Sequence, residues 1–490
     1  MTDYSNILRT TRLRSSSVAG RTVLTESESD RGRVLFCPAF RRLQQKAQVF
    51  SMEPNAAVRS RLTHSFEVSQ LGRYIADEVG QRLVKLGKLD FAEQGALVNF
   101  VETACLMHDI GNPPFGHFGE AAIRNWFKLN GERCARSALG LPSKKVPADQ
   151  SRQLSRSLAD FYEFDGNPQG LRIVTRLQWN TDPFGLNLTK TTLASFLKYV
   201  RQAGAPASGN FTKKAGFFLT EKAIIDSVWQ EFNYAKPQRF PLAYIMEAAD
   251  DIAYCISDLE DSFEKNIVHE DLALGEIERR YLAHNFPDSN PVHAEIGAAL
   301  ADVRKGERNG KEFTYTDFRT SLNRTIVFYV ATRYIQQHEM VLKGTLDSLL
   351  PRTEPAGAVL EVLRGYCRDF VYPHDSVQRI ELAGYTAIRG LLDHFKVLLE
   401  CSQERFEAAM EYKTKDSKGE PIVIESKLLR LFPDKYKKVY KHHLSEANGG
   451  GDLAKFEEWN ARAHLVVDFI SGMTDDFAMT SYRTLSGMRL

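Results

Sequence analysis

Residues 105–120 read CLMHDIGNPPFGHFGE, and this stretch places two ionisable side chains directly after an apolar run. His108 and Asp109 follow residues 104–107 with no polar side chain in front of them. Burying a carboxylate beside an imidazole is unfavourable unless something compensates, and a divalent cation would compensate for both. A His-Asp pair that caps a buried helix is the ordinary alternative, and for the dipeptide alone it is favoured until further ligands are found.

The same stretch then turns and begins a second helix. Pro113 and Pro114 end the first helix, since proline cannot continue it and restricts the residue before it. Beyond the turn, His117 and Glu120 stand three residues apart, which places both side chains on one helix face. We interpret the stretch as metal ligands followed by an acid/base pair, although His117 alone could be an ordinary surface residue.

Length and composition limit the classes of protein to which the chain can belong. The chain has 490 residues, 43% of them hydrophobic, so we expect two or more lobes or one large composite domain. Its net charge of +2, from 64 basic and 62 acidic residues, excludes a polycation that coats nucleic acid. The six cysteines form no Cys-x-x-Cys pair, which argues against a zinc ribbon or a disulfide scaffold and fits a reducing compartment.

The sequence gives no sign of membrane insertion. The first residues lack an apolar segment behind a basic start, and no stretch of about 18 apolar residues occurs. We therefore expect a protein of the cytoplasm with no membrane partner.

The patterns predict a predominantly helical, all-α fold in three parts. Residues 1–25 form a basic arm, for which a solvated tail is favoured over an arm that orders against a partner or an anionic ligand. Residues 26–270 form the core, which includes a polar insertion at about 130–240. Residues 271–490 form a C-terminal helical region that completes the site and the oligomer contacts. Strands are expected only as short hairpins, one of them at residues 213–218.

Two further helices carry candidate ligands. His64 begins an amphipathic helix whose apolar residues recur at helical spacing from Val68 onward. A second helix covers residues 242–263, where Asp250, Tyr254 and Asp258 stand four apart and share one face. Acidic residues among Ala, Ile and Met suit a cation and a polar ligand, and a solvated helix face is the alternative.

Taken together, His64, His108, Asp109 and Asp250 occur in the order H…HD…D. This order resembles the HD-domain phosphohydrolase superfamily, in which such a set binds a divalent metal within a helical core. The resemblance to one family in it, the deoxyguanosine triphosphate triphosphohydrolases, covers nearly the whole chain. Its motifs are residues 29–33, 41–46, 48–50, 61–65, 108–120, 247–254 and 470–475.

The resemblance implies hydrolysis of a deoxynucleoside triphosphate, usually dGTP, to the deoxynucleoside and inorganic triphosphate. By this match His64, His108, Asp109 and Asp250 hold Mn²⁺ or Mg²⁺, which activates water for attack at the α-phosphate. His117 and Glu120 would be the catalytic acid/base pair. A metal that lowers the pKa of its water and an imidazole that moves a proton are consistent with this chemistry.

The family also implies a set of substrate contacts. The phosphates would meet Lys198, Tyr199 and Lys214, and Asn167 would lie in a turn near the site. Tyr254 would stack on the sugar, Gln48 and Asp258 would bind its 3′-hydroxyl, and Val49 would exclude a 2′-hydroxyl. Candidate base contacts are Tyr372 and Glu381.

Two positions depart from the family pattern. Glu163 stands where the family has the first histidine of His-Phe-Glu-Gly-Asn-Ala-Gln, so it cannot act as an imidazole. Lys427 stands where an arginine is usual, and lysine cannot make the bidentate contact of a guanidinium. The loss of the guanidinium weakens the case for strict guanine selection.

Other functions remain open at this point. One is an HD phosphohydrolase that acts on a nucleoside monophosphate or an alarmone, and another is a dNTP-sensing or single-stranded-DNA-binding module. Family membership also implies a homo-oligomer, often a hexamer.

Overall fold

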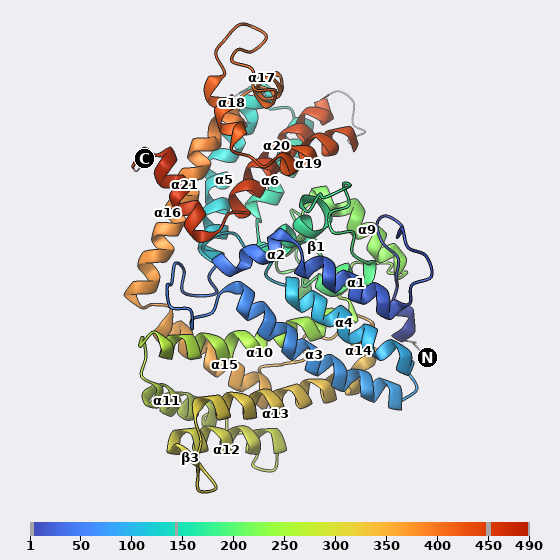
Figure 1. The fold of residues 1–490 in the computed structure, drawn as a ribbon, viewed down its shortest axis with the longest axis vertical. Helices are drawn as coiled ribbons and strands as arrows, with labels where there is room; N and C mark the ends of the chain where they lie inside the picture. Colours follow the sequence, from blue (N-terminus) through green and yellow to red (C-terminus); the bar gives the residue numbers. More distant parts are fainter. Residues whose placement is uncertain (1–3, 143–145, 447–451, 489–490) are drawn as a thin grey trace.

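Helices form nearly all of the fold in the computed structural model, which describes residues 4–142, 146–446 and 452–488 (Figure 1). The predicted all-α class is confirmed. In the described residues, regular strands occur as two short pairs. No helix in this part of the chain has the length and apolar character needed to cross a membrane.

A central group of helices carries the residues predicted as ligands. α4 (Phe91–Met107) packs against α3 (Arg61–Lys85), and both pack against α10 (Pro241–Glu264). Every residue of α4 from Ala96 to Met107 is buried, as expected for a helix that is apolar on all sides. α1 (Val23–Leu35) and α8 (Lys190–Phe196) complete this layer against α4.

Local sequence signals define where these helices begin. Ser60 and Thr63 form a capping box at the start of α3, three residues before His64. Pro241 occupies the first turn of α10, where its missing N–H costs nothing. The ligands thus lie on helices with well-defined ends.

C-terminal helices pack on the segment that follows the Pro-Pro turn (top of Figure 1). α5 (Gly116–Leu139) packs against α16 (Asp375–Glu400), α20 (Asp452–Ser471) and α6 (Ala148–Tyr162). α21 (Asp475–Leu485) lies along α16. The same part of the chain contains α17 (Gln403–Met410), α18 (Val423–Arg430) and α19 (Asp434–Glu446).

A second group of helices covers α10 and α3 from the other side (bottom of Figure 1). It consists of α11 (Glu270–Leu282), α12 (Pro291–Lys305), α13 (Tyr315–Gln336), α14 (His338–Leu342) and α15 (Pro355–Tyr366). A π-helical turn, η6 (Cys367–Val371), leads from α15 toward α16. The cavity described below lies between the two groups.

The predicted insertion contributes helices and one strand pair. It contains α7 (Gly166–Arg172), α9 (Lys222–Glu231), β1 (Arg201–Gln202) and β2 (Ala215–Phe217). β2 pairs with β1 in parallel, so the hairpin predicted at residues 213–218 is wrong. An antiparallel hairpin instead joins β3 (Glu307–Arg308) to β4 (Lys311–Glu312).

Backbone segments approach closely behind the Pro-Pro turn. A Cβ atom added at Gly111 would lie 2.0 Å from the carbonyl oxygen of Gly166 and 2.1 Å from the nitrogen of Gly170. Only glycine permits this contact between the 109–112 turn and α7. The insertion is thereby fixed directly against the ligand-bearing turn.

The N-terminal arm is docked, which corrects the interpretation of it as a solvated tail. Arg12 is 5% exposed, forms ion pairs with Glu26 and Asp30, and donates to the carbonyl oxygen of Asn187. Tyr4 is fully buried as well. The composition of the arm could not reveal this, because its partners come from α1 and the insertion.

Candidate metal centre and its cavity

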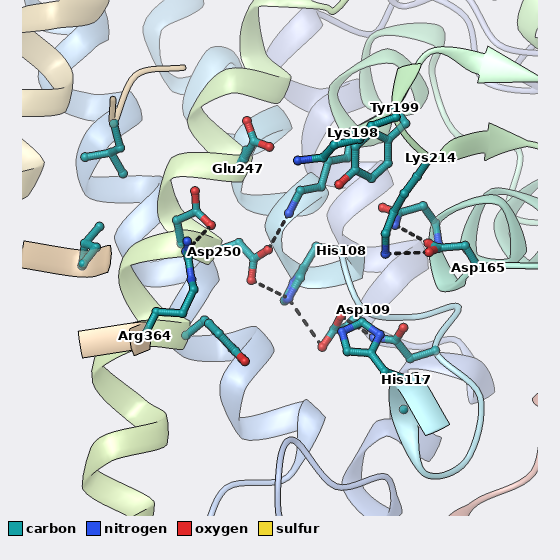
Figure 2. A pocket seen from close by; sticks show the side chains of 18 of the residues that line it. His108, Asp109, His117, Asp165, Lys198, Tyr199, Lys214, Glu247, Asp250 and Arg364 are labelled. Atoms are coloured by element: carbon teal, nitrogen blue, oxygen red, sulfur yellow. Dashed lines mark hydrogen bonds and ion pairs between the residues drawn. The ribbon is translucent and has the colours of Figure 1, made fainter. Parts of the chain in front are cut away.

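Three helices bring the four predicted ligands together. His64 lies in the first turn of α3, His108 and Asp109 follow the end of α4, and Asp250 lies within α10. Nε2 of His64 and Nε2 of His108 lie 3.6 Å and 3.4 Å from the same oxygen of Asp250. One ligand atom each from His64, His108 and Asp109 lie within 4.8 Å of one another. Figure 2 shows His108 between the two carboxylates.

Unpaired nitrogen atoms indicate that a cation fits here. His108 Nδ1 lies 2.7 Å from the carbonyl oxygen of Cys105, so Nδ1 donates its proton there and Nε2 presents a lone pair. Nε2 of His108 and both ring nitrogens of His64 are buried without a hydrogen-bond partner. Such atoms are costly, and a divalent cation bound by Nε2 of each histidine would compensate for one unpaired nitrogen on each ring. A mixed nitrogen and oxygen set suits Mn²⁺, Fe²⁺ or Mg²⁺.

The surrounding charges keep both carboxylates ionised. Burial alone would raise the pKa of Asp250, but Lys198 at 3.0 Å and the imidazoles hold it well below its ordinary value. Burial also opposes ionisation of Asp109, whereas Arg61 at 2.5 Å and the imidazoles lower its pKa to about 2. Both groups are therefore anionic near neutral pH, as metal ligands must be.

The predicted acid/base pair lies in the first turns of α5, close to this cluster (Figure 2). His117 Nδ1 lies 2.9 Å from one oxygen of Glu120, and the other oxygen accepts a hydrogen bond from the nitrogen of Gly166 at 2.7 Å. Glu120 is 2% exposed, whereas the His117 side chain is 79% exposed. One ring nitrogen is thus fixed while Nε2 remains accessible, which is the geometry that proton transfer requires.

A cavity of about 1490 Å³ adjoins the metal cluster. Its walls come from the N-terminal core, the insertion and the C-terminal helices together. Besides His108, Asp109 and Asp250, the lining includes most of the other predicted site residues: Gln48, Val49, His117, Glu120, Asn167, Lys198, Tyr199, Lys214, Tyr254, Tyr372 and Glu381. His64 is fully buried behind the ligands that reach the surface of the cavity.

Asp258 lies behind the wall of this cavity. It is 1% exposed and is not among the lining residues. One of its carboxylate oxygens accepts a hydrogen bond from the hydroxyl of Tyr372 at 2.6 Å, and that hydroxyl lies 2.7 Å from the hydroxyl of Tyr254. Burial raises the pKa of Asp258 to about 7 despite these hydrogen bonds. Direct contact between Asp258 and a ligand requires the two tyrosines to move. Without such a movement, Asp258 acts on a ligand only through its hydrogen bonds with the tyrosine hydroxyls.

Two lysines stand on the side of the cavity formed by the insertion (Figure 2). Lys198 forms its ion pair with Asp250, and Lys214 forms one with Asp165 at 2.7 Å. Asp165 also accepts a hydrogen bond from the side chain of Asn167 at 2.6 Å and caps α7. Both cations face the cavity from this side and suit an anionic ligand that contacts them together.

The structure accounts for the departure at Glu163. Its carboxylate pairs with Arg201 at 2.5 Å and accepts from the nitrogen of Gly204 at 3.0 Å, and the residue does not line the cavity. Lys427 lies on α18 and does not line the cavity either. Neither departure therefore places a side chain in the wall of the cavity.

The sequence analysis missed several charged residues that line the cavity, among them Arg61, Asp165 and Arg364. Arg364 lies 3.2 Å from Asp251, the neighbour of the predicted ligand Asp250. The only available signals were that Arg61 precedes His64 by one helical turn and that Asp165 precedes Asn167. Neither signal specifies a contact with the site.

Comparison with known proteins places this arrangement in a family. The HD domain family matches residues 61–142, the segment that contains His64, His108 and Asp109. A Pseudomonas aeruginosa protein named probable deoxyguanosinetriphosphate triphosphohydrolase is 36% identical over 490 residues, which covers 95% of this chain and 94% of that protein. The deoxyguanosinetriphosphate triphosphohydrolase of Serratia proteamaculans is 37% identical over 498 residues, which covers 94% of each.

The helical fold and the His-His-Asp cluster define an HD-domain protein, a class for which a divalent metal cofactor is implied. The likeness to the two relatives extends over almost the entire chain. The chain belongs to the deoxyguanosinetriphosphate triphosphohydrolase family, and it is a hydrolase.

Proposed function

We propose that this protein hydrolyses deoxynucleoside triphosphates, with dGTP preferred, to the deoxynucleoside and inorganic triphosphate. One observation carries the proposal. A His-His-Asp cluster, an imidazole that is hydrogen-bonded to a buried carboxylate, and two lysines all lie around one cavity. The names of the two relatives supply the substrate, since both are called deoxyguanosinetriphosphate triphosphohydrolases.

The proposed metal ligands are His64, His108, Asp109 and Asp250, and the proposed ion is Mn²⁺ or Mg²⁺. When bound, the ion would lower the pKa of a water molecule and screen the charge of the phosphates. Lys198 and Lys214 would attract the triphosphate, and Tyr199 lies between them in sequence and in the cavity wall. The ion pair between Lys198 and Asp250 would then break. Lys198 would contact the triphosphate, and Asp250 would contact the metal ion.

The proposed reaction breaks the bond between the α-phosphorus and the 5′-oxygen. Water adds to phosphorus, and the departing oxygen must gain a proton. His117 can deliver that proton from Nε2, because Nδ1 is hydrogen-bonded to the buried carboxylate of Glu120. Glu120 stabilises the protonated ring and holds its orientation, and Gly166 holds Glu120.

Recognition of the nucleoside is assigned to other residues of the cavity wall. Tyr254 would stack on the sugar, Gln48 would contact its 3′-hydroxyl, and Val49 would leave no room for a 2′-hydroxyl. Tyr372 and Glu381 would meet the base, and burial raises the pKa of Glu381 to about 7 despite nearby His117. A homo-oligomeric state and a cytoplasmic location are further parts of this proposal.

Product identification tests the proposal. Protein supplied with Mn²⁺ or Mg²⁺ is incubated with each of the four dNTPs and with GTP, and the phosphate products are separated by anion exchange and identified by ³¹P NMR. We expect inorganic triphosphate and deoxynucleoside, with the fastest turnover for dGTP and little turnover of GTP. Release of orthophosphate or pyrophosphate instead would contradict the proposed bond cleavage, and binding without turnover would indicate a sensing module.

A further inference from the structure

The corner between α20 and α21 reaches two loops that line the cavity. Asp475 is the first residue of α21 and is 3% exposed. One of its carboxylate oxygens accepts a hydrogen bond from the nitrogen of Phe115 at 3.0 Å. The other accepts from the nitrogen of Ala47 at 3.1 Å. A single carboxylate therefore joins the segment before α5 to the segment before α3.

Each of these loops carries residues of the proposed site. Ala47 is followed directly by Gln48 and Val49, which line the cavity, and Phe115 stands two residues before His117. Asp475 itself is absent from the cavity lining, so it cannot touch the substrate. Its hydrogen bonds to these loops are the two that it accepts from backbone amides.

Phe115 needs an external restraint. It adopts a left-handed conformation with φ of 60°, which is unfavourable for a residue with a side chain, and it occupies the N-cap of α5 without a capping hydrogen bond. Its ring packs against Gly384 of α16, where an added Cβ would lie 2.2 Å from the ring. The hydrogen bond that Phe115 donates to Asp475 and this packing together fix the first turn of α5.

A second connection runs parallel to the first. Lys46 is buried, and its ammonium group donates to the carbonyl oxygen of Asn112 at 2.5 Å and to that of Ser471 at 2.8 Å. Asn112 in turn donates to Asp109 at 2.5 Å. The same C-terminal corner thus contacts the metal-binding turn through Lys46 and the start of α5 through Asp475.

We propose that Asp475 is a positioning residue that sets the separation between His117 and the Gln48–Val49 loop, although it lies outside the cavity. The inference rests on the proposed function for what the two loops bind. Loss of the bond to Phe115 displaces His117 and lowers kcat. Loss of the bond to Ala47 displaces Gln48 and Val49 and raises KM for the nucleotide.

The test compares Asp475→Asn with Thr474→Ala. Asparagine keeps one acceptor oxygen but turns an amide NH₂ toward the other backbone N–H, so one bond is lost. Thr474 caps the same helix by accepting from the nitrogen of Phe477 at 3.3 Å. In the part of the chain that the structure describes it makes no hydrogen bond to either loop, so its variant is a control for weakening of α21. Asp475→Ser, which keeps one short acceptor, replaces the first variant if that variant does not fold.

We expect Asp475→Asn to lower kcat by about 10- to 100-fold, the loss typical of a displaced catalytic group, and to raise KM. Bound Mn²⁺ per chain should stay unchanged, and Thr474→Ala should keep kcat within about twofold of wild type. An Asp475→Asn kcat equal to that of wild type, or an equal loss in Thr474→Ala, would overturn the inference.

Hydrogen exchange gives a readout that needs no substrate. In Asp475→Asn, peptides that contain residues 46–50 and 113–118 should exchange faster than in wild type and in Thr474→Ala. Unchanged protection of both peptides would refute the role of the carboxylate. A wild-type protein that releases no triphosphate would refute the proposed function alone, and the exchange result would still decide the positioning of the loops.

Discussion

His117 combines a fixed ring nitrogen with an exposed ring. Its Nδ1 is held by Glu120, while most of the side chain is open to the cavity. This arrangement distinguishes it from His64 and His108, whose rings are buried among the carboxylates. The division between buried ligands and an exposed imidazole is the basis for assigning proton transfer to His117.

Substitution of His117 tests this assignment. His117→Ala should lower kcat by about 100-fold or more, because general acid catalysis contributes roughly 10²- to 10⁴-fold, and it should leave bound Mn²⁺ unchanged. Steady-state kinetics and metal analysis measure the two quantities. His442→Ala is the control, since His442 pairs with Glu446 at 3.3 Å and does not line the cavity. Turnover by His117→Ala at the wild-type rate would remove the residue from the mechanism.

For single residues, the sequence could identify ionisable side chains that stand among apolar ones. His108 and Asp109 after an apolar run, and Asp250 among Ala and Ile, were identifiable because burial of such groups needs compensation. Asp475 was not identifiable as a contact of Phe115, since 360 residues separate them and the acceptor meets a backbone amide. Asp258 shares a helix face with Asp250, but Tyr372 covers it, and sequence periodicity cannot show a covering side chain from another element.

Elements that looked peripheral in the sequence are integrated into the fold. The N-terminal arm contributes Arg12 to a buried cluster with Glu26 and Asp30, which also accepts hydrogen bonds from Thr189 and Thr192. The arm therefore joins α1 to the start of α8, the helix that precedes Lys198.

Removal of the Arg12 guanidinium tests the docking of the arm. Arg12→Ala leaves two buried carboxylates without their cation, so we expect the free energy of unfolding to fall by about 3–5 kcal/mol. Chemical denaturation measures the change. Arg9→Ala is the control, because the Arg9 side chain lies on the exposed part of the arm, and it should change stability by less than about 0.5 kcal/mol. Equal stability of the two variants would contradict the docked arm.

A buried pair also connects α6 to α20. Asp160 lies 3.0 Å from Nε2 of His464 and accepts from the nitrogen of Leu219 at 2.9 Å. Burial raises the pKa of Asp160 to about 7, and burial together with Arg172 holds the pKa of His464 well below its ordinary value. Below about pH 7 the contact is therefore a hydrogen bond between a protonated carboxyl group and a neutral imidazole.

This pair predicts a pH dependence of stability. In the folded state Asp160 keeps its proton up to about pH 7, whereas in the unfolded state it loses the proton near pH 4. The stabilisation that this proton provides is therefore complete below about pH 4 and is lost as the pH rises toward 7. Asp160→Asn removes that dependence. The free energy of unfolding of the variant minus that of wild type should rise by at most about 1.4 kcal/mol per pH unit over this range.

Denaturant titrations at pH values from 4 to 8 measure the difference. Asp149→Asn is the control, because the Asp149 side chain is 93% exposed, and its difference from wild type should stay flat. A flat difference for Asp160→Asn as well would show that Asp160 is ionised in the folded protein.

The whole molecule assembles the site from distant parts of the chain. Lining residues extend from Ala47 to Leu382, and the corner at Asp475 supports two of the loops from outside. The helical class and the ligand set could be predicted from the sequence because both depend on local patterns. A contribution of the C-terminal region to the site was implied by the family resemblance alone, because the packing of α15 and α16 around the cavity depends on contacts between distant segments that local patterns do not specify.

The most direct measurement is the affinity for Mn²⁺ of wild type, Asp250→Asn and Asp251→Asn. Titration calorimetry gives the affinity, and metal analysis after gel filtration gives the number of bound ions per chain. Asp250 faces the two imidazoles, whereas Asp251 faces Arg364, so the pair provides a matched control within one helix. We expect one tightly bound ion per chain in wild type and in Asp251→Asn, and at least about tenfold weaker binding in Asp250→Asn. Wild-type affinity in Asp250→Asn, or loss of the ion only in Asp251→Asn, would contradict the convergence of His64, His108, Asp109 and Asp250 on a single cation.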